Sequence, residues 1–133
     1  ETVTQKCWAQ IRSKESFGVG EFTDLQLLVD WASKTEMKLI QILPVNDTTA
    51  THTWQDSYPY AAISAFALHP IYLNMEEVAG KKYASLIKPL KSKQKELNEL
   101  ADVDYKEVLK IKLATFRELF LLMKEAFLED ADF

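Results

Sequence analysis

Residues 38–60 read KLIQILPVNDTTATHTWQDSYPY, and the interpretation of the whole chain depends on this stretch. An apolar run over 39–43 ends at Pro44, which is typical of a short buried strand. The loop that follows is polar and aromatic, and its candidate binding residues are Asn46, Asp47, His52, Trp54, Asp56, Ser57, Tyr58 and Tyr60. Binding residues concentrate on loops held by rigid elements, so the stretch predicts a strand followed by a ligand-binding loop.

The residues before this stretch predict another strand and a helix. Residues 1–11 alternate apolar and polar side chains, as a half-buried strand does. Thr23 is a suitable N-cap with Gln26 three residues on, and the apolar spacing predicts a helix over 24–34. A helix between two strands favours a parallel βαβ unit, and therefore an α/β fold for residues 1–73.

Residues 74–133 predict a helical region. A first helix is expected over 82–101, with a kink near Pro89. A second begins after Asp104, which can cap it together with Glu107, and its apolar side chains recur every three or four residues: Leu109, Leu113, Phe116, Phe120, Met123 and Phe127. The two helices predict a helical hairpin that buries a shared seam.

Composition narrows the classes of function. Of the 133 residues, 47% are hydrophobic, which is enough for a core, and the net charge is −4 without a basic stripe. Nucleic acid and anionic membranes are therefore not expected partners. The single Cys7 allows no internal disulfide, and no apolar run approaches the roughly 20 residues of a membrane span. The sequence predicts a soluble, cytoplasmic protein.

Three kinds of reactive site have weak support in the sequence. Gly18-Val-Gly20 before a helix could hold a phosphate, but it lacks the third glycine and the GK[ST] ending, so a plain turn is favoured. His52 with Asp47 and Asp56 could form an open metal site, against ordinary loop hydrogen bonding. The two aspartates could also be a glycosidase carboxylate pair, although sequence does not fix their separation. Neither a metal nor a cofactor is expected.

Aromatic side chains in the loop favour a sugar ligand. Trp54, Tyr58 and Tyr60 offer flat apolar faces with polar edges. A sugar ring needs an aromatic plane under its C–H face and amides or carboxylates around its hydroxyls, and Asn46 and Asp56 are of those types. The alternative is that the aromatic residues belong to the core.

Longer motifs add a resemblance to a known family. Residues 16–35, SFGVGEFTDLQLLVDWASKT, and 38–73 contain the blocks G-x-G-[DE]-F, LP-x-N-D and DS-x-PY in order. They resemble the start of the catalytic barrel of amylomaltases, the 4-α-glucanotransferases of glycoside hydrolase family 77. The branch with the plant cytosolic disproportionating enzyme and its bacterial relatives is the most similar. The resemblance covers residues 12–73, and more loosely the helical part through 102–105.

The resemblance implies part of a (β/α)₈ TIM barrel followed by a helical insert. It implies an enzyme of starch and maltose metabolism that cleaves α-1,4-glucosidic bonds and transfers the glucan to an acceptor sugar. A covalent glucosyl-enzyme intermediate would retain the stereochemistry. Tyr60 would stack on the glucose beside the cleaved bond. The other expected substrate-binding residues are Asn46, Asp47, Trp54, Asp56 and Ser57, of which the first two shape the loop.

Two departures from the family pattern accompany the resemblance. Residues 1–11 alternate where a buried parallel strand is a nearly continuous apolar run. A full barrel takes about 250 residues, and the family's three catalytic carboxylates lie later in its chain. The chain is therefore expected to be an inactive fragment, with exposed barrel edges that favour a homo-oligomer. The alternative is a noncatalytic glucan-binding or helix-mediated interaction module.

Overall fold

The computed structural model describes residues 11–128, so the strand expected over 1–11 falls almost entirely outside the described residues. Within the described part, helices are the regular elements and no strand is formed. The α-helices are α1 (Phe22–Lys34), α2 (Met75–Ile87), α3 (Lys91–Glu99) and α4 (Tyr105–Leu128), and the 3₁₀ turns are η2 (Trp54–Ser57), η3 (Pro70–Tyr72) and η4 (Lys88–Leu90).

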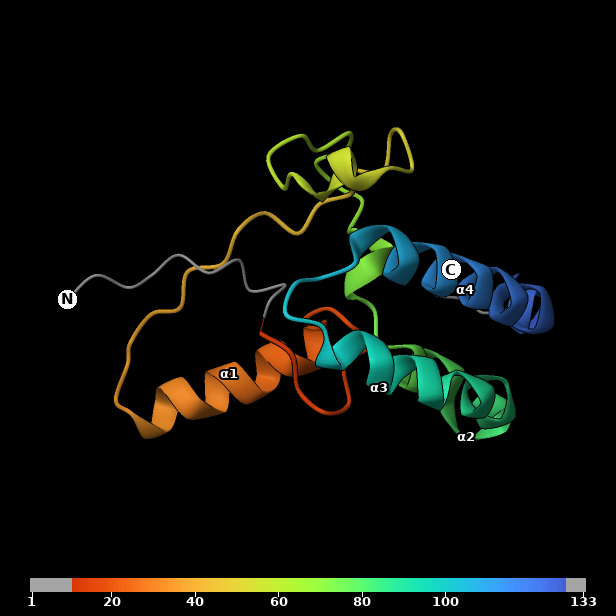
Figure 1. Ribbon diagram of the computed structural model, residues 1–133, viewed down its shortest axis with the longest axis horizontal. Helices are drawn as coiled ribbons and strands as arrows, with labels where there is room; N and C mark the ends of the chain where they lie inside the picture. Colours follow the sequence, from red (N-terminus) through yellow and green to blue (C-terminus); the bar gives the residue numbers. More distant parts are fainter. Residues whose placement is uncertain (1–10, 129–133) are drawn as a thin grey trace.

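The elements form a helical body with two outlying parts (Figure 1). Helix α4 packs against α2 and against η3, and α3 returns along the same side of the molecule. Helix α1 extends away from this body on the opposite side. The loop of residues 45–69 forms a separate lobe above the helices, which we call the loop lobe. No helix in the described part is both long enough and apolar enough to cross a bilayer.

Residues 38–43, where a strand was predicted, form no strand in the structure. Leu39 is 84% exposed. A parallel strand exists only through hydrogen bonds to its neighbours, and among residues 11–128 no segment forms a ladder with this one. The described residues therefore form no strand here, and the βαβ unit and the barrel around it stay predictions.

The helix predicted over 24–34 is confirmed, but it begins two residues earlier with a different cap. Glu21 is the N-cap in place of Thr23. The backbone N–H of Glu21 donates to Asp24 Oδ2 over 2.7 Å, and Ser16 Oγ donates to the same oxygen over 2.7 Å. The acidic residue at the third helical position thus takes the role that was expected of Gln26.

The single helix predicted over 82–101 is two helices. Helix α2 begins at Met75, after Asn74 Oδ1 accepts the Glu77 N–H over 2.9 Å. The 3₁₀ turn η4 contains Pro89 and separates α2 from α3. The predicted kink near Pro89 is confirmed, because proline lacks the N–H that would continue the α-helical pattern.

Helix α4 begins as predicted, with Asp104 Oδ1 accepting the Glu107 N–H over 3.0 Å. Of the apolar residues predicted for its buried face, Leu109 is buried, and Leu113, Phe116 and Met123 pack partly buried against the core, whereas Phe120 is 54% exposed. The buried residues of this helix are Val108, Leu109, Lys112, Thr115 and Leu119. They meet a core that also contains Phe17, Val19, Ile71, Tyr72, Met75, Ala79, Ile87 and Leu97.

Candidate functional site

The loop lobe is closed at its base by a short antiparallel contact. The Asp47 N–H donates to the Ala67 carbonyl over 2.8 Å, and the His69 N–H donates to the Val45 carbonyl over 2.9 Å. These bonds flank an isolated bridge between Asn46 and Leu68. Two ends of the loop that are more than 20 residues apart in sequence are thus fixed side by side, so the residues between them form a defined lobe.

The side chains of Asn46 and Asp47 form hydrogen bonds with the backbone of the lobe. Asn46 Nδ2 donates to the Ala65 carbonyl over 2.9 Å, and Asp47 Oδ1 accepts the Thr49 N–H over 2.9 Å. The Asp47 carbonyl also accepts the Ile63 N–H over 2.9 Å. Both residues stabilise the loop conformation, which is the geometry expected of residues that shape a loop.

Asp56 is buried inside the lobe and accepts several hydrogen bonds. Its Oδ2 accepts the Thr51 N–H over 3.0 Å and the His52 N–H over 2.7 Å, and its Oδ1 accepts the Thr51 hydroxyl over 2.8 Å. Burial alone would raise the pKa of Asp56, but the hydrogen bonds from Thr51 and from the 50–52 backbone outweigh burial and lower it. A carboxylate held in this way is ionised and structural.

The reactive sites weighed from the sequence are not assembled. Among residues 11–128 no three His, Cys, Asp or Glu side chains gather as metal ligands, so the hypothesis of a site at Asp47, His52 and Asp56 is wrong. The Gly18 N–H donates to Asn98 Oδ1 over 2.7 Å, and Val19 is buried in the core. The glycine pair is therefore occupied by the protein itself and forms the plain turn.

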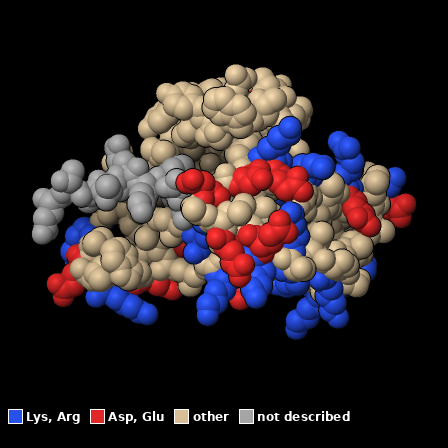
Figure 2. Space-filling view, viewed as in Figure 1, with Lys and Arg blue, Asp and Glu red and all other residues tan. Residues whose placement is uncertain are grey.

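The three aromatic side chains that the sequence favoured for sugar binding face solvent, as does Phe66 of the same lobe. Trp54 is 71% exposed, Tyr58 60% and Tyr60 62%. The rings of Tyr58 and Tyr60 lie 5.6 Å apart at a tilt of 52°. The alternative that these aromatics are core residues is wrong for this structure. Exposed aromatic rings on an otherwise uncharged surface are available for stacking on a ligand, and the lobe shows no charged side chain on the face seen in Figure 2.

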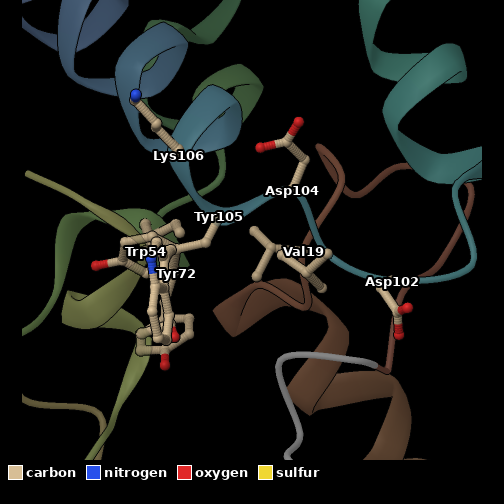
Figure 3. Close-up of a pocket in the computed structure, with 10 residues that line it drawn as sticks. Val19, Trp54, Tyr72, Asp102, Asp104, Tyr105 and Lys106 are labelled. Atoms are coloured by element: carbon tan, nitrogen blue, oxygen red, sulfur yellow. The ribbon is translucent and has the colours of Figure 1, made fainter.

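A pocket lies between the loop lobe and the start of α4. It encloses about 440 Å³. Trp54 and Ser57 contribute from the lobe, Val19, Ile71 and Tyr72 line it from the core, and residues 102–106 close the other side (Figure 3). Tyr60 does not line this pocket. The structure thus places Trp54 and Ser57 together, with Asp56 buried behind them, and places Tyr60 beside Tyr58.

Tyr105 lines this pocket and also contacts the buried His69. Its hydroxyl lies 2.7 Å from His69 Nε2. Burial raises the pKa of Tyr105 to about 12, and the charges of Asp56 and Asp47 add to this rise. Burial also lowers the pKa of His69, against the Asp47 and Asp56 carboxylates, which raise it. Both rings are therefore neutral at pH 7.

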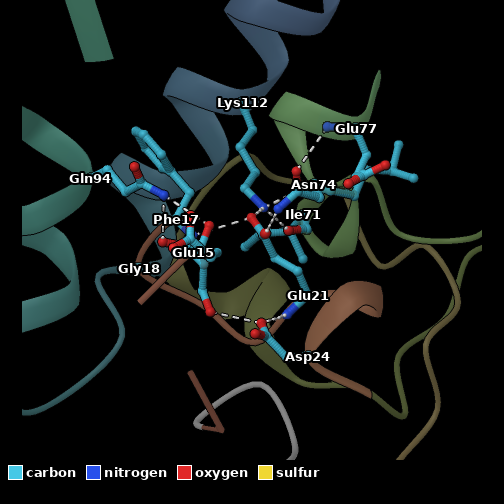
Figure 4. A network of polar contacts seen from close by, with 12 residues as sticks. Glu15, Phe17, Gly18, Glu21, Asp24, Ile71, Asn74, Glu77, Gln94 and Lys112 are labelled. Carbon is cyan, nitrogen blue, oxygen red and sulfur yellow. Dashed lines mark hydrogen bonds and ion pairs between the residues drawn. The ribbon is translucent and has the colours of Figure 1, made fainter. Parts of the chain in front are cut away.

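A buried ion pair beneath the pocket was missed in the sequence. Lys112 Nζ donates to Glu21 Oε1, to the Ile71 carbonyl over 2.6 Å and to the Leu73 carbonyl over 2.9 Å (Figure 4). Burial raises the pKa of Glu21 and lowers that of Lys112, and in each case the partner's charge opposes the shift. The helical spacing of Val108 and Lys112 could have indicated that this lysine shares the buried face.

Comparisons with known proteins agree on one family. A family model described as 4-alpha-glucanotransferase matches residues 9–133. The 4-alpha-glucanotransferase DPE2 of Oryza sativa subsp. japonica is 43% identical over 123 residues, which are 92% of this chain and 13% of that protein. The 4-alpha-glucanotransferase of Chlamydia muridarum is 34% identical over 114 residues, 86% of this chain and 21% of that protein. The chain therefore spans less than a quarter of the length of either relative.

Proposed function

The chain belongs to the 4-alpha-glucanotransferase family, and on this premise we propose that its loop lobe is part of the glucan-binding site of such an enzyme. The resemblance indicated by the motifs in 16–35 and 38–73 is thereby confirmed. The proposed reaction cleaves an α-1,4-glucosidic bond and transfers the glucan to an acceptor sugar with retention. The proposed ligand of this chain is a maltooligosaccharide or a longer α-1,4-glucan.

The observation that carries this proposal is the pocket beside the exposed ring of Trp54. An indole face can support the C–H side of a glucose ring. Ser57 and Asp102 also line this pocket, and residues of these types can bond to sugar hydroxyls. A volume of about 440 Å³ falls within the range of small-molecule pockets.

The paired rings of Tyr58 and Tyr60 offer a second surface for stacking outside this pocket. Their separation of 5.6 Å and their exposure leave both rings accessible to a chain of sugars. We propose that Tyr60 stacks on the glucose beside the cleaved bond, while Asn46 and Asp47 hold the loop in shape. We propose that Trp54 and Ser57 contact the glucan, because both line the pocket.

Catalysis by the 133 residues alone is not expected. Asp56 is buried and fully engaged by backbone and hydroxyl donors, so it has no access to a sugar. Asp47 is committed to the loop backbone. We propose that the nucleophile and the acid/base of the retaining reaction are contributed by other parts of a (β/α)₈ barrel, and that this chain binds glucan without transferring it.

The direct test of glucan binding is a calorimetric titration of the chain with maltoheptaose. We expect Trp54→Ala to weaken binding by at least about fivefold, because it removes the stacking face. Trp31→Ala is the matched control, since this second exposed tryptophan lies on α1 and away from the pocket. Equal effects of the two substitutions, or no binding by the unsubstituted chain, would favour the interaction-module alternative.

A second test measures transferase activity with maltotriose as the substrate. We expect the chain to release neither glucose nor longer glucans when it is incubated with this substrate. Disproportionation above the level of a heat-denatured sample would contradict the proposal that the reacting carboxylates lie elsewhere.

A further inference from the structure

His69 is a buried residue whose two ring nitrogens both have partners. It is 2% exposed and lies at the N-terminus of η3. Its Nδ1 accepts the Ile71 N–H over 3.2 Å, and its Nε2 lies 2.7 Å from Tyr105 Oη. A backbone N–H can only donate, so Nδ1 carries no proton. The proton of the neutral ring therefore sits on Nε2, which donates to the Tyr105 hydroxyl.

The packing of the two rings fixes this donation. The His69 ring meets Tyr105 edge to face, with centroids 5.8 Å apart and planes at 88°. It meets Tyr72 in a similar way, at 5.6 Å and 61°. The histidine is thus held on one side by a core residue that also lines the pocket and on the other by the first residue of α4. It has little freedom to turn away from Tyr105.

The backbone of His69 is fixed to the loop lobe. Its N–H donates to the Val45 carbonyl over 2.9 Å, beside the Asn46–Leu68 bridge that closes the lobe at its base. His69 is therefore bonded to the lobe through its backbone and to Tyr105, at the start of α4, through its ring. The lobe contains the 3₁₀ turn η2, which carries Trp54 and Ser57.

We propose that His69 is a positioning residue for glucan binding, which fixes the loop lobe relative to the start of α4 through its backbone bond to Val45 and its ring bond to the Tyr105 hydroxyl. The inference rests on the proposed function, because the two walls it holds together are the walls of the proposed glucan pocket. His69 does not line that pocket and touches no ligand there. It acts on the pocket only by holding the loop lobe and Tyr105 in place.

The test compares His69→Asn, Tyr105→Phe and the double substitution. Asparagine retains an acceptor near the place of Nδ1 for the Ile71 N–H but does not reach Tyr105, and phenylalanine retains the ring packing without the hydroxyl. We expect each single variant to bind maltoheptaose about fivefold more weakly, the size of one net hydrogen bond. The double variant is expected to bind no more weakly than the weaker single, because both changes break the same link.

His69→Gln is the rescue variant, since its amide nitrogen can replace the Nε2 donor toward Tyr105. We expect it to bind more tightly than His69→Asn. Multiplying effects in the double variant, or unchanged binding in both singles, would overturn the proposal. If His69→Asn fails to fold, Tyr105→Phe compared with His69→Gln carries the test, because phenylalanine retains the ring packing and glutamine retains a donor toward Tyr105. Tyr105→Phe is then expected to bind more weakly than His69→Gln, and equal binding would overturn the proposal.

A readout without sugar separates this inference from the proposed function. In ¹⁵N-labelled chain we expect the His69 ring to show the Nε2–H tautomer and the Trp54 indole resonance to shift in Tyr105→Phe. Trp31, on α1, is the internal reference. These signals are expected even if maltoheptaose does not bind, in which case only the proposed function fails. An Nδ1–H tautomer, or a Trp54 signal that does not respond, would overturn the positioning role.

Discussion

Glu21 and Lys112 form an ion pair in which neither side chain has any solvent-accessible surface. Glu21 is the N-cap of α1 and Lys112 lies in α4, 91 residues later. Glu21 Oε2 also accepts Asn74 Nδ2 over 2.6 Å, and Oε1 accepts the Phe17 N–H over 3.2 Å. The pair therefore connects the start of α1, the cap of α2 and the middle of α4 at one point.

Removing the lysine alone should be strongly destabilising. We expect Lys112→Met to lower the free energy of unfolding by about 3–5 kcal/mol, because it leaves the Glu21 carboxylate buried without its counter-charge. Glu21→Gln combined with Lys112→Met should be less destabilised than Lys112→Met alone, since the amide keeps an acceptor for the Phe17 N–H and carries no charge. Urea unfolding followed by circular dichroism measures all of these values.

Lys110→Met is the matched control for this prediction. Lys110 lies half a turn before Lys112 on the same helix, but its side chain is 76% exposed and stands 3.9 Å from Glu107. Its replacement should change the free energy of unfolding by less than about 0.5 kcal/mol. A double variant as unstable as Lys112→Met would contradict the account of an uncompensated buried charge.

Gly18 and Gly80 both have positive φ, but only Gly18 is surrounded by the core. A Cβ on Gly18 would meet Val108 Cγ2 at 2.8 Å and Leu97 Cβ at 2.9 Å, whereas a Cβ on Gly80 would meet nothing within 4 Å. Gly80→Ala should carry only the backbone cost, about 1–3 kcal/mol. Gly18→Ala should add about 1–3 kcal/mol of overpacking. Thermal unfolding of the two variants tests this order, and a Gly18→Ala variant as stable as Gly80→Ala would refute it.

The loop lobe should open only at acidic pH. The pKa of Asp56 is lowered in the folded state, so its hydrogen bonds stabilise the lobe at pH values above the unfolded pKa of about 4, and this contribution is lost as the pH falls through the lower folded value. We expect the fluorescence of Trp54 to change below pH 4 in a Trp8→Phe, Trp31→Phe background. Asp56→Asn should lack this transition, and the same transition in both proteins would point to another group.

The sequence was informative where structure depends on neighbouring residues in the chain. The helix over 24–34, the Asp104 cap and the break at Pro89 follow from local backbone chemistry, and all three are present. The strand over 38–43 needs a partner segment, and none of the described residues supplies one. The apolar residues of this segment therefore favour a strand, but the described residues provide no partner for it.

The residues of the candidate site were likewise predictable from the sequence only in part. The exposed ring of Trp54 could be chosen from composition, because aromatic residues in a polar loop are typical of sugar sites. The contribution of His69, Tyr105 and Lys112 depends on contacts between segments 36 to 91 residues apart. A lysine among apolar residues and a histidine before a proline can each occupy many environments. Their roles therefore become clear only from the folded structure.

Helix α1 leaves an apolar surface in contact with solvent, which predicts self-association. Leu27 and Trp31 lie one turn apart and are 57% and 52% exposed, and Leu39 in the following segment is 84% exposed. Contiguous exposed apolar patches of this kind favour association. We expect sedimentation velocity at tens of micromolar to show a dimer or larger species.

Replacing both residues of the α1 surface by charged ones should dissociate these species. Leu27→Glu with Trp31→Glu places two like charges one helical turn apart, so any copy packed against this face would have to bury unpaired carboxylates. Phe120→Glu is the control, because this residue of α4 is exposed to a similar degree, 54%. Dissociation by the α1 pair but not by Phe120→Glu would place the contact on α1. A monomeric unsubstituted chain at the same concentration would contradict the prediction, because the exposed face would then be stable in water without a partner.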